Sequence, residues 1–264
     1  MNFIKNIKNM FSGSGGELEE TSPVAGTEDS PIESLVTNPE HPPNKTEAPV
    51  IRRVIRAPVA SNDLFPPDDP EKVLIRAQPS TTGDQCLFMV NRPLLPGYSW
   101  WFPTFESAAG SPLTERLFSL DDVESVLIHE AAVTVTRKDK TIFDWKPLGA
   151  EIGAAIREAL EEGGDLIAET IVNEMPSEEA VRHGIQKAID EEVNPGVAGH
   201  GGRITLEKVK GNTITIQMGG GCQGCSAADV TLKQGIHGSF RKFVPQVGAI
   251  FDETDHAAGT NPYF

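Results

Sequence analysis

Two cysteines three positions apart carry the clearest chemical signal in the sequence. Cys222 and Cys225 lie in the run Gly219-Gly220-Gly221-Cys222-Gln223-Gly224-Cys225. A loop of this size points both sulfurs the same way, so the two thiols can bind one metal or form one disulfide. The glycines keep side chains away from the sulfurs and supply backbone conformations that other residues resist. This composition predicts a metal or redox site rather than a pair of inert core thiols.

The residues that follow Cys225 favour the thiolate form of both cysteines. The run Ser226-Ala227-Ala228-Asp229 matches the capping-box pattern, which predicts a helix N-terminus directly behind Cys225. The positive end of a helix lowers the pKa of a nearby thiol, and its unpaired amides can donate hydrogen bonds to sulfur. We therefore expect the helix to support whatever the two sulfurs bind.

The number of ligands decides what the pair can hold. Structural zinc sites and iron–sulfur clusters generally need four protein ligands, and the motif supplies only two. A two-fold dimer brings two Cys222/Cys225 pairs face to face and completes a site of four thiolates at the interface. A cluster held in this way is shared and exposed, so it is released when the dimer opens, as a carrier requires.

Two other functions fit the same residues. A dithiol oxidoreductase of the thioredoxin type also places Cys-x-x-Cys between a strand and a helix. Here, however, the motif follows a predicted hairpin rather than a βαβ unit. A zinc-binding interaction module is the other alternative, because four thiolates hold zinc equally well.

The sequence resembles the NifU C-terminal (Nfu) family. The resemblance runs from Asn194 to Phe251 and is carried by four segments: Asn194-Pro195, Gly201-Gly202, the run from Gly219 to Cys225, and Thr231-Leu232-Lys233-Gln234-Gly235-Ile236. An earlier stretch is similar to the domain that precedes it in many Nfu proteins, through Ser111-Pro112-Leu113-Thr114-Glu115-Arg116-Leu117-Phe118 and Val133-Thr134-Val135-Thr136. Together the two similarities cover most of the chain beyond its first 72 residues.

The resemblance implies an iron–sulfur scaffold and carrier rather than an enzyme. It implies a [4Fe–4S] cluster held between two subunits, with Cys222 and Cys225 as the ligands, which is passed to apo-proteins. The implied partners are a second copy of the chain, apo iron–sulfur client proteins and an upstream cluster-assembly scaffold. Many family members carry an acid before the paired glycines, where this chain has His200.

We expect an α+β fold with two small domains. Residues 73–164 form the first domain, with strands at 73–76, 86–90, 123–128 and 132–136, a short helix after Ser111-Pro112, and a longer helix from Asp144 to Gly163-Gly164. Residues 165–176 are expected to be a linker.

The second domain is expected at residues 177–264. Ser177 caps a helix that Asn194-Pro195 ends, and a β-hairpin turns at Lys210-Gly211-Asn212. A further helix and a last strand at 247–251 follow the cysteine motif.

Residues 1–72 have the composition of a flexible leader. They hold ten of the 20 prolines, and acids far outnumber bases between residues 12 and 50. The net charge of −15 repels phosphate backbones, which argues against nucleic-acid binding. The sequence contains no run of 18 apolar residues, so we expect no transmembrane helix. With no clear transit peptide, we expect a bacterial cytoplasmic protein rather than one of an organelle matrix.

Three other features lie outside the cysteine motif. Cys86 lies in an apolar, strand-like run and is expected to be a buried core thiol. His200 is interpreted as a loop histidine, with an auxiliary ligand as the alternative. The aromatic stretch from Tyr98 to Phe105 anchors a core or a loop, or forms a client-docking patch.

Overall fold

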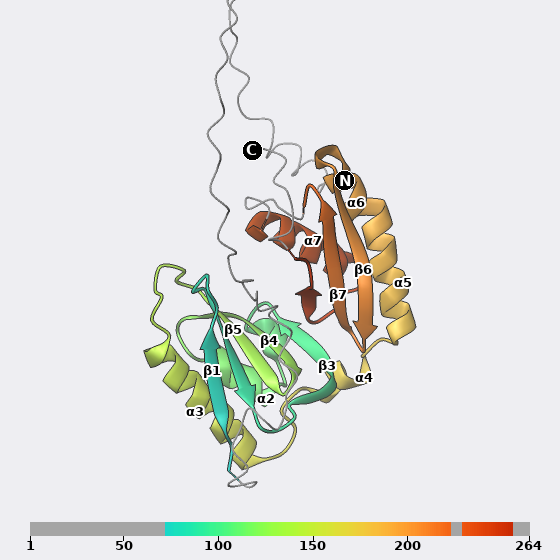
Figure 1. Ribbon diagram of the computed structural model, residues 1–264. Helices are drawn as coiled ribbons and strands as arrows, with labels where there is room; N and C mark the ends of the chain where they lie inside the picture. Colours follow the sequence, from blue (N-terminus) through green and yellow to red (C-terminus); the bar gives the residue numbers. More distant parts are fainter. Residues whose placement is uncertain (1–71, 223–228, 256–264) are drawn as a thin grey trace, which may run out of the picture.

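Two β-sheets organise the residues that the computed structural model describes, which are 72–222 and 229–255 (Figure 1). The first sheet has five antiparallel strands in the order β1-β2-β5-β4-β3. The second has three strands in the order β6-β7-β8. Each sheet has its own helices and its own hydrophobic core, which confirms the expected α+β class.

The first sheet is built from five strands, of which β5 shows the clearest alternation of buried side chains. The strands are β1 (Ile75–Pro79), β2 (Gln85–Val90), β3 (Leu95–Phe102), β4 (Val123–Glu130) and β5 (Ala132–Arg137). In β5 every second side chain is buried, as a half-buried strand requires. β4 and β5 confirm the strand pair predicted at 123–136.

Helices cover the core of the first sheet. They are η2 (Glu106–Ala108), α2 (Pro112–Phe118) and α3 (Lys146–Glu162). On α3 the spacing of Leu148, Ile152 and Ile156 places all three in the core, as their periodicity predicts. The helix ends at Gly163, also as predicted.

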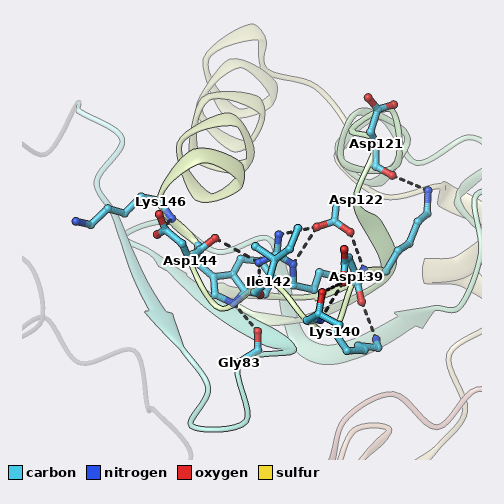
Figure 2. Close-up of polar contacts among 12 residues, drawn as sticks. Gly83, Asp121, Asp122, Asp139, Lys140, Ile142, Asp144 and Lys146 are labelled. Carbon is cyan, nitrogen blue, oxygen red and sulfur yellow. Dashed lines mark hydrogen bonds and ion pairs between the residues drawn. The ribbon is translucent and has the colours of Figure 1, made fainter.

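A buried arginine fixes the loop between β5 and α3, and Figure 2 shows its partners Asp122 and Ile142 in this loop region. The Arg137 guanidinium, 3% exposed, donates to the Asp122 carboxylate at 2.6 and 2.9 Å and to the carbonyl oxygen of Ile142 at 2.7 Å. It also lies 4.9 Å from the Trp145 ring centroid. The Trp145 indole in turn donates to the carbonyl oxygen of Gly83 at 2.8 Å. These contacts hold the start of α3 against the sheet.

The segment expected to be a linker packs against the first domain. It contains the short helix α4 (Glu169–Asn173), and Ile167 is buried in the first core. The Leu113 amide donates to the carbonyl oxygen of Leu166, and the Ala168 amide donates to the Ser111 hydroxyl at 3.0 Å. Residues up to Ala168 are therefore tied to α2.

The second domain begins with a helix that continues past its predicted end. Ser177 caps α5 (Glu178–Ala188) by accepting from the Ala180 amide at 3.2 Å, as predicted. Contrary to prediction, Asn194-Pro195 does not end the helical segment, which continues as the π-helix η3 (Ile189–Val193), then α6 (Asn194–Val197) and η4 (Ala198–His200). Pro195 lies in the first turn of α6, directly after the π-helix, and the helical segment continues through it.

The second sheet consists of a hairpin and one further short strand. β6 (Gly202–Lys210) and β7 (Thr213–Gly220) are antiparallel, as predicted, and the short strand β8 (Ile250–Asp252) adds to β7 in parallel. The helix α7 (Asp229–Phe243) packs on α5 and buries Ile236 and Phe240.

The aromatic stretch forms the edge strand β3, which the sequence did not reveal. Phe102 is fully buried in the first core and Trp100 packs against it. Ser99 and Trp101 point to the opposite side and contact the second domain. β3 is therefore covered on both sides. Only Phe105, beyond the strand, is largely exposed, at 58%.

Candidate metal centre

Cys222 lies directly beyond the end of β7. The strand ends at Gly220, and the Cys222 amide then donates to the carbonyl oxygen of Gly219 in a tight turn, at 3.4 Å. The side chain is 5% exposed and belongs to the core of the second domain. The hairpin therefore holds the backbone of Cys222 at one end of the sheet.

Gly202 makes room for the Cys222 sulfur. A Cβ atom added at Gly202 would lie 2.3 Å from Cys222 Sγ, and 3.2 Å from Cβ of Val197. Carbon and sulfur do not approach so closely without a bond, so the sulfur occupies the space that any side chain at position 202 would take. Gly202 and Val197 therefore line the space that holds the Cys222 sulfur. We call this space the glycine cradle.

The glycine pairs of the two strands face each other at this end of the hairpin. Gly202 pairs with Gly220, and the Gly221 amide donates to the carbonyl oxygen of Gly201 at 3.1 Å. Gly220 has a φ of +58°, and a Cβ there would lie 2.0 Å from the Gly201 oxygen. Both the conformation and the contact require glycine at 220. The two motifs, about 20 residues apart in sequence, therefore form one structural unit.

Part of the predicted site lies outside the described residues. Cys225 and the capping residues Ser226, Ala227 and Ala228 fall in the gap between 222 and 229. The helix expected behind Cys225 is α7, which begins at Asp229. The order of hairpin, cysteine motif and helix therefore agrees with the sequence-based expectation at both ends of the gap.

The other two candidate residues lie in different settings. His200 ends η4 two residues before β6, so its backbone adjoins the glycine cradle. Cys86 lies in β2, in the core of the first domain, and is 1% exposed. Burial raises the pKa of the Cys86 thiol to about 11. The prediction of a buried core thiol is confirmed for Cys86.

The described residues do not complete a metal site by themselves. Within 72–222 and 229–255, no group of three or more His, Cys, Asp and Glu side chains is placed to hold a metal ion. The same ranges contain no helix long and apolar enough to cross a membrane.

Sequence analysis missed the role of Gly202 and its neighbour Val197. The sequence marks the Gly201-Gly202 pair only as a motif, without a structural reason. The signal that could have found it is the hairpin register: a turn at residues 211–212 pairs position 202 with 221, and the register shift between Leu206 and Lys208 moves that pairing by one residue to Gly220, close to Cys222. The described structure thus adds a steric partner to the cysteine motif.

Two family models match the chain. Residues 75–163 match the N-terminal domain of scaffold proteins of the Nfu/NifU type, and residues 185–251 match the NifU-like domain. The first match covers the five-stranded sheet with α2 and α3. The second covers the glycine cradle, Cys222, Cys225 and α7.

Curated relatives share about two fifths of their aligned residues with this chain. A protein named Fe/S biogenesis protein NfuA from Xanthomonas euvesicatoria is 39% identical over 117 residues, which are 44% of this chain and 59% of the relative. The NfuA of Acinetobacter baylyi is 42% identical over 90 residues, 32% of this chain and 42% of the relative. The alignments thus span about half of each relative's length.

One solved structure was also found to be similar. It is the solution structure of a NifU-like protein from Saccharomyces cerevisiae, at 19% identity and a TM-score of 0.33, covering 37% of this chain and 86% of the other. That likeness is too distant to carry an argument.

Proposed function

Because the chain belongs to the Nfu-type family of NifU-like proteins, we propose that it is an iron–sulfur cluster carrier that binds a [4Fe–4S] cluster through Cys222 and Cys225. The cluster is cargo, received from an upstream scaffold and passed to apo-proteins. The observation that supports this proposal best is the glycine cradle. The hairpin leaves at position 202 only the room that the Cys222 sulfur needs.

Two copies of the chain share the cluster in this proposal. Four thiolates suit a [4Fe–4S] cluster, and the motif supplies two. The third cysteine of the chain, Cys86, lies in the separate core of the first domain and does not serve as a ligand. A two-fold dimer supplies the missing pair.

Loading of the cluster requires Cys222 to become accessible. Its side chain is 5% exposed in the described structure. A ligand sulfur must meet iron, so we infer that the residues covering the thiol move aside when the second copy and the cluster arrive, while the sulfur stays in the cradle. In the protein without cargo, burial limits the access of oxidants to the thiol.

Anaerobic reconstitution with iron and sulfide tests the proposal. The wild-type chain is expected to become brown and to carry one [4Fe–4S] cluster per two chains, observed by visible absorption and Mössbauer spectroscopy together with the mass of the product. The Cys222→Ala variant is expected to lose the cluster. Cys86→Ala is the matched control, because it removes a buried thiol from the other core, and it is expected to keep the cluster.

The alternatives give different results in the same experiment. A colourless protein that retains zinc would favour the interaction module. A metal-free protein that reduces disulfides would favour the dithiol oxidoreductase. Normal cluster occupancy in Cys222→Ala would refute the assignment of this ligand.

A further inference from the structure

The open edge of β3 carries a group of hydrogen bonds to the second domain. β3 is the last strand of its sheet, so its outer backbone groups have no strand to pair with. At Ser99 the amide donates to Oδ1 of Asn212 at 2.9 Å, and the carbonyl oxygen accepts from Nδ2 of Asn212 at 2.6 Å. The carboxamide of Asn212 thus takes the place of a neighbouring strand.

The Ser99 side chain adds two more contacts across the same boundary. Its hydroxyl shares a hydrogen bond of 2.8 Å with the hydroxyl of Thr213, and it accepts from the Ala249 amide at 2.7 Å. Ser99 and Asn212 are fully buried, and Thr213 is 7% exposed. Asn212 Nδ2 also donates to the carbonyl oxygen of Gln246 at 2.7 Å, which positions the carboxamide for Ser99. Buried polar groups that bind one another across a boundary favour a single relative orientation of the elements that carry them.

The contact between β3 and the second domain, which we call the joint, is close enough to require glycine at two positions. A Cβ atom at Gly248 would lie 2.2 Å from the Ser99 hydroxyl oxygen and 2.5 Å from the Ser99 carbonyl oxygen. Across the β6–β7 turn, a Cβ at Gly211 would lie 2.3 Å from the carbonyl oxygen of Gly97. Both glycines belong to the second domain, and both let its backbone touch β3.

Contacts of other kinds surround the hydrogen bonds. The Arg241 guanidinium, from the last turn of α7, lies 4.0 Å from the Trp101 ring centroid and donates to the carbonyl oxygen of Gly248. Burial lowers the pKa of Arg241 to about 10, which leaves it charged at neutral pH. The His129 and Phe251 rings meet edge to face at 5.2 Å. An ion pair between Lys210 and Glu130 lies at the exposed rim.

We propose that the β3 edge is a docking surface whose partner is the second domain of the same chain, and that this joint holds the two domains as one rigid body. The default for two small domains on a short connection is relative motion. Here an interlocking set of buried polar contacts, two glycine contacts and a cation–π pair opposes that motion.

The joint leaves the cysteine end of the second domain uncovered by the first. Asn212 and Thr213 stand at the start of β7 and Cys222 follows its end, so the strand separates them by roughly 25 Å. In Figure 1, β7 runs away from the first domain. If the proposed function holds, a second copy can approach Cys222 while the first domain stays in a fixed position behind it.

Nuclear spin relaxation of backbone amides in the full chain without cargo tests the joint. Rotational correlation times are measured separately for amides of β1–β5 and of β6–β8. The wild type is expected to give one shared value. Gly248→Ala places a methyl group against Ser99 and is expected to give two values, with that of the second domain falling to roughly half.

Gly238→Ala is the matched control for Gly248→Ala. It makes the same change in the same domain, on α7, where a Cβ meets no described atom within 4 Å, and it is expected to keep the shared value. Two values in the wild type, or a shared value in Gly248→Ala, would overturn the proposal.

A second pair of variants covers the case in which Gly248→Ala unfolds its domain. Ser99→Ala removes the hydroxyl from the joint, whereas Ser111→Ala removes a buried hydroxyl that binds an amide within the first domain. Only Ser99→Ala is expected to separate the two correlation times, and equal behaviour of the pair would refute the joint. Because no cluster is present, a failure of cluster binding leaves this test unaffected.

Discussion

The substitution Gly202→Ala tests the steric link between the hairpin and the thiol. The added methyl carbon would lie 2.3 Å from Cys222 Sγ, whereas ordinary contact begins at 3.4 Å. The sulfur, the strand or both must therefore move by about 1 Å. Val197 closes the other side, with its Cβ at 3.2 Å, so the methyl group has no other direction in which to move.

A shift of this size is large for a metal ligand but modest for the fold. Sulfur–metal distances in functional sites hold within about 0.2 Å of their ideal values. Overpacking of a core by one methyl group costs about 1–3 kcal/mol, which a domain of ordinary stability survives. We therefore expect Gly202→Ala to fold and to lose most of its cluster occupancy after reconstitution.

The matched control is Gly219→Ala, on the opposite strand of the same hairpin end. There a Cβ would lie 3.8 Å from the carbonyl oxygen of Arg203, an ordinary contact. Iron and sulfide per chain are measured for both variants, alongside urea denaturation to confirm folding. Equal cluster occupancy in the two variants would refute the cradle, because the methyl group would then not disturb the ligand.

Two further predictions concern the first domain. Cys86 is expected to resist alkylation by iodoacetamide at pH 8 in the native chain and to react on unfolding, because burial raises its pKa to about 11; peptide mass analysis checks this, and native labelling would contradict it. Since the folded pKa of Cys86 is raised, the stability that comes from its protonated form is lost as pH rises from about 9 toward 11. Arg137→Met is expected to lower the free energy of unfolding by about 3 kcal/mol at pH 7, because it leaves the Asp122 carboxylate and the Ile142 carbonyl without their buried donor. Burial alone would raise the pKa of Asp122, but hydrogen bonds from the Asp139 amide and from Arg137 hold it below its ordinary value, so the stability they provide is lost as pH falls below about 4. Urea denaturation at pH 7 and pH 3 is expected to show the difference between wild type and variant narrowing in acid, and a constant difference would contradict the assignment.

Elements with a clear periodicity could be predicted from sequence. The elements α3, β4 and β5 each bury one face in a single core. Their apolar residues therefore recur at a regular spacing that can be recognised without the structure. β3 was missed because it serves two surfaces. Trp100 and Phe102 face the first core while Ser99 and Trp101 face the second domain, and this removes the contrast between apolar and polar positions on which strand prediction depends.

The candidate site was likewise predictable from the sequence only in part. The cysteine motif is local in sequence, so its chemistry could be anticipated from spacing alone. The cradle depends on the pairing of Gly202 with Gly220, which is a long-range contact, and on Val197, which an unexpected helical turn brings into position. The continuation of the helix past Pro195 was not predicted because proline usually marks an end, and the π-turn before it leaves no sequence signal.

That extended helix has a consequence for how copies of the chain can associate. The Oδ1 atom of Asn194 accepts a hydrogen bond from the Ile204 amide at 2.8 Å. Its Nδ2 atom donates to the Ile204 carbonyl oxygen at 3.2 Å. β6 is an edge strand, and its backbone at Ile204 is therefore already occupied. An incoming strand cannot extend the sheet at this point. The helix thus blocks strand addition at the edge of β6 near the cysteine motif. This protection against aggregation suits a protein whose proposed function requires repeated contact between its copies.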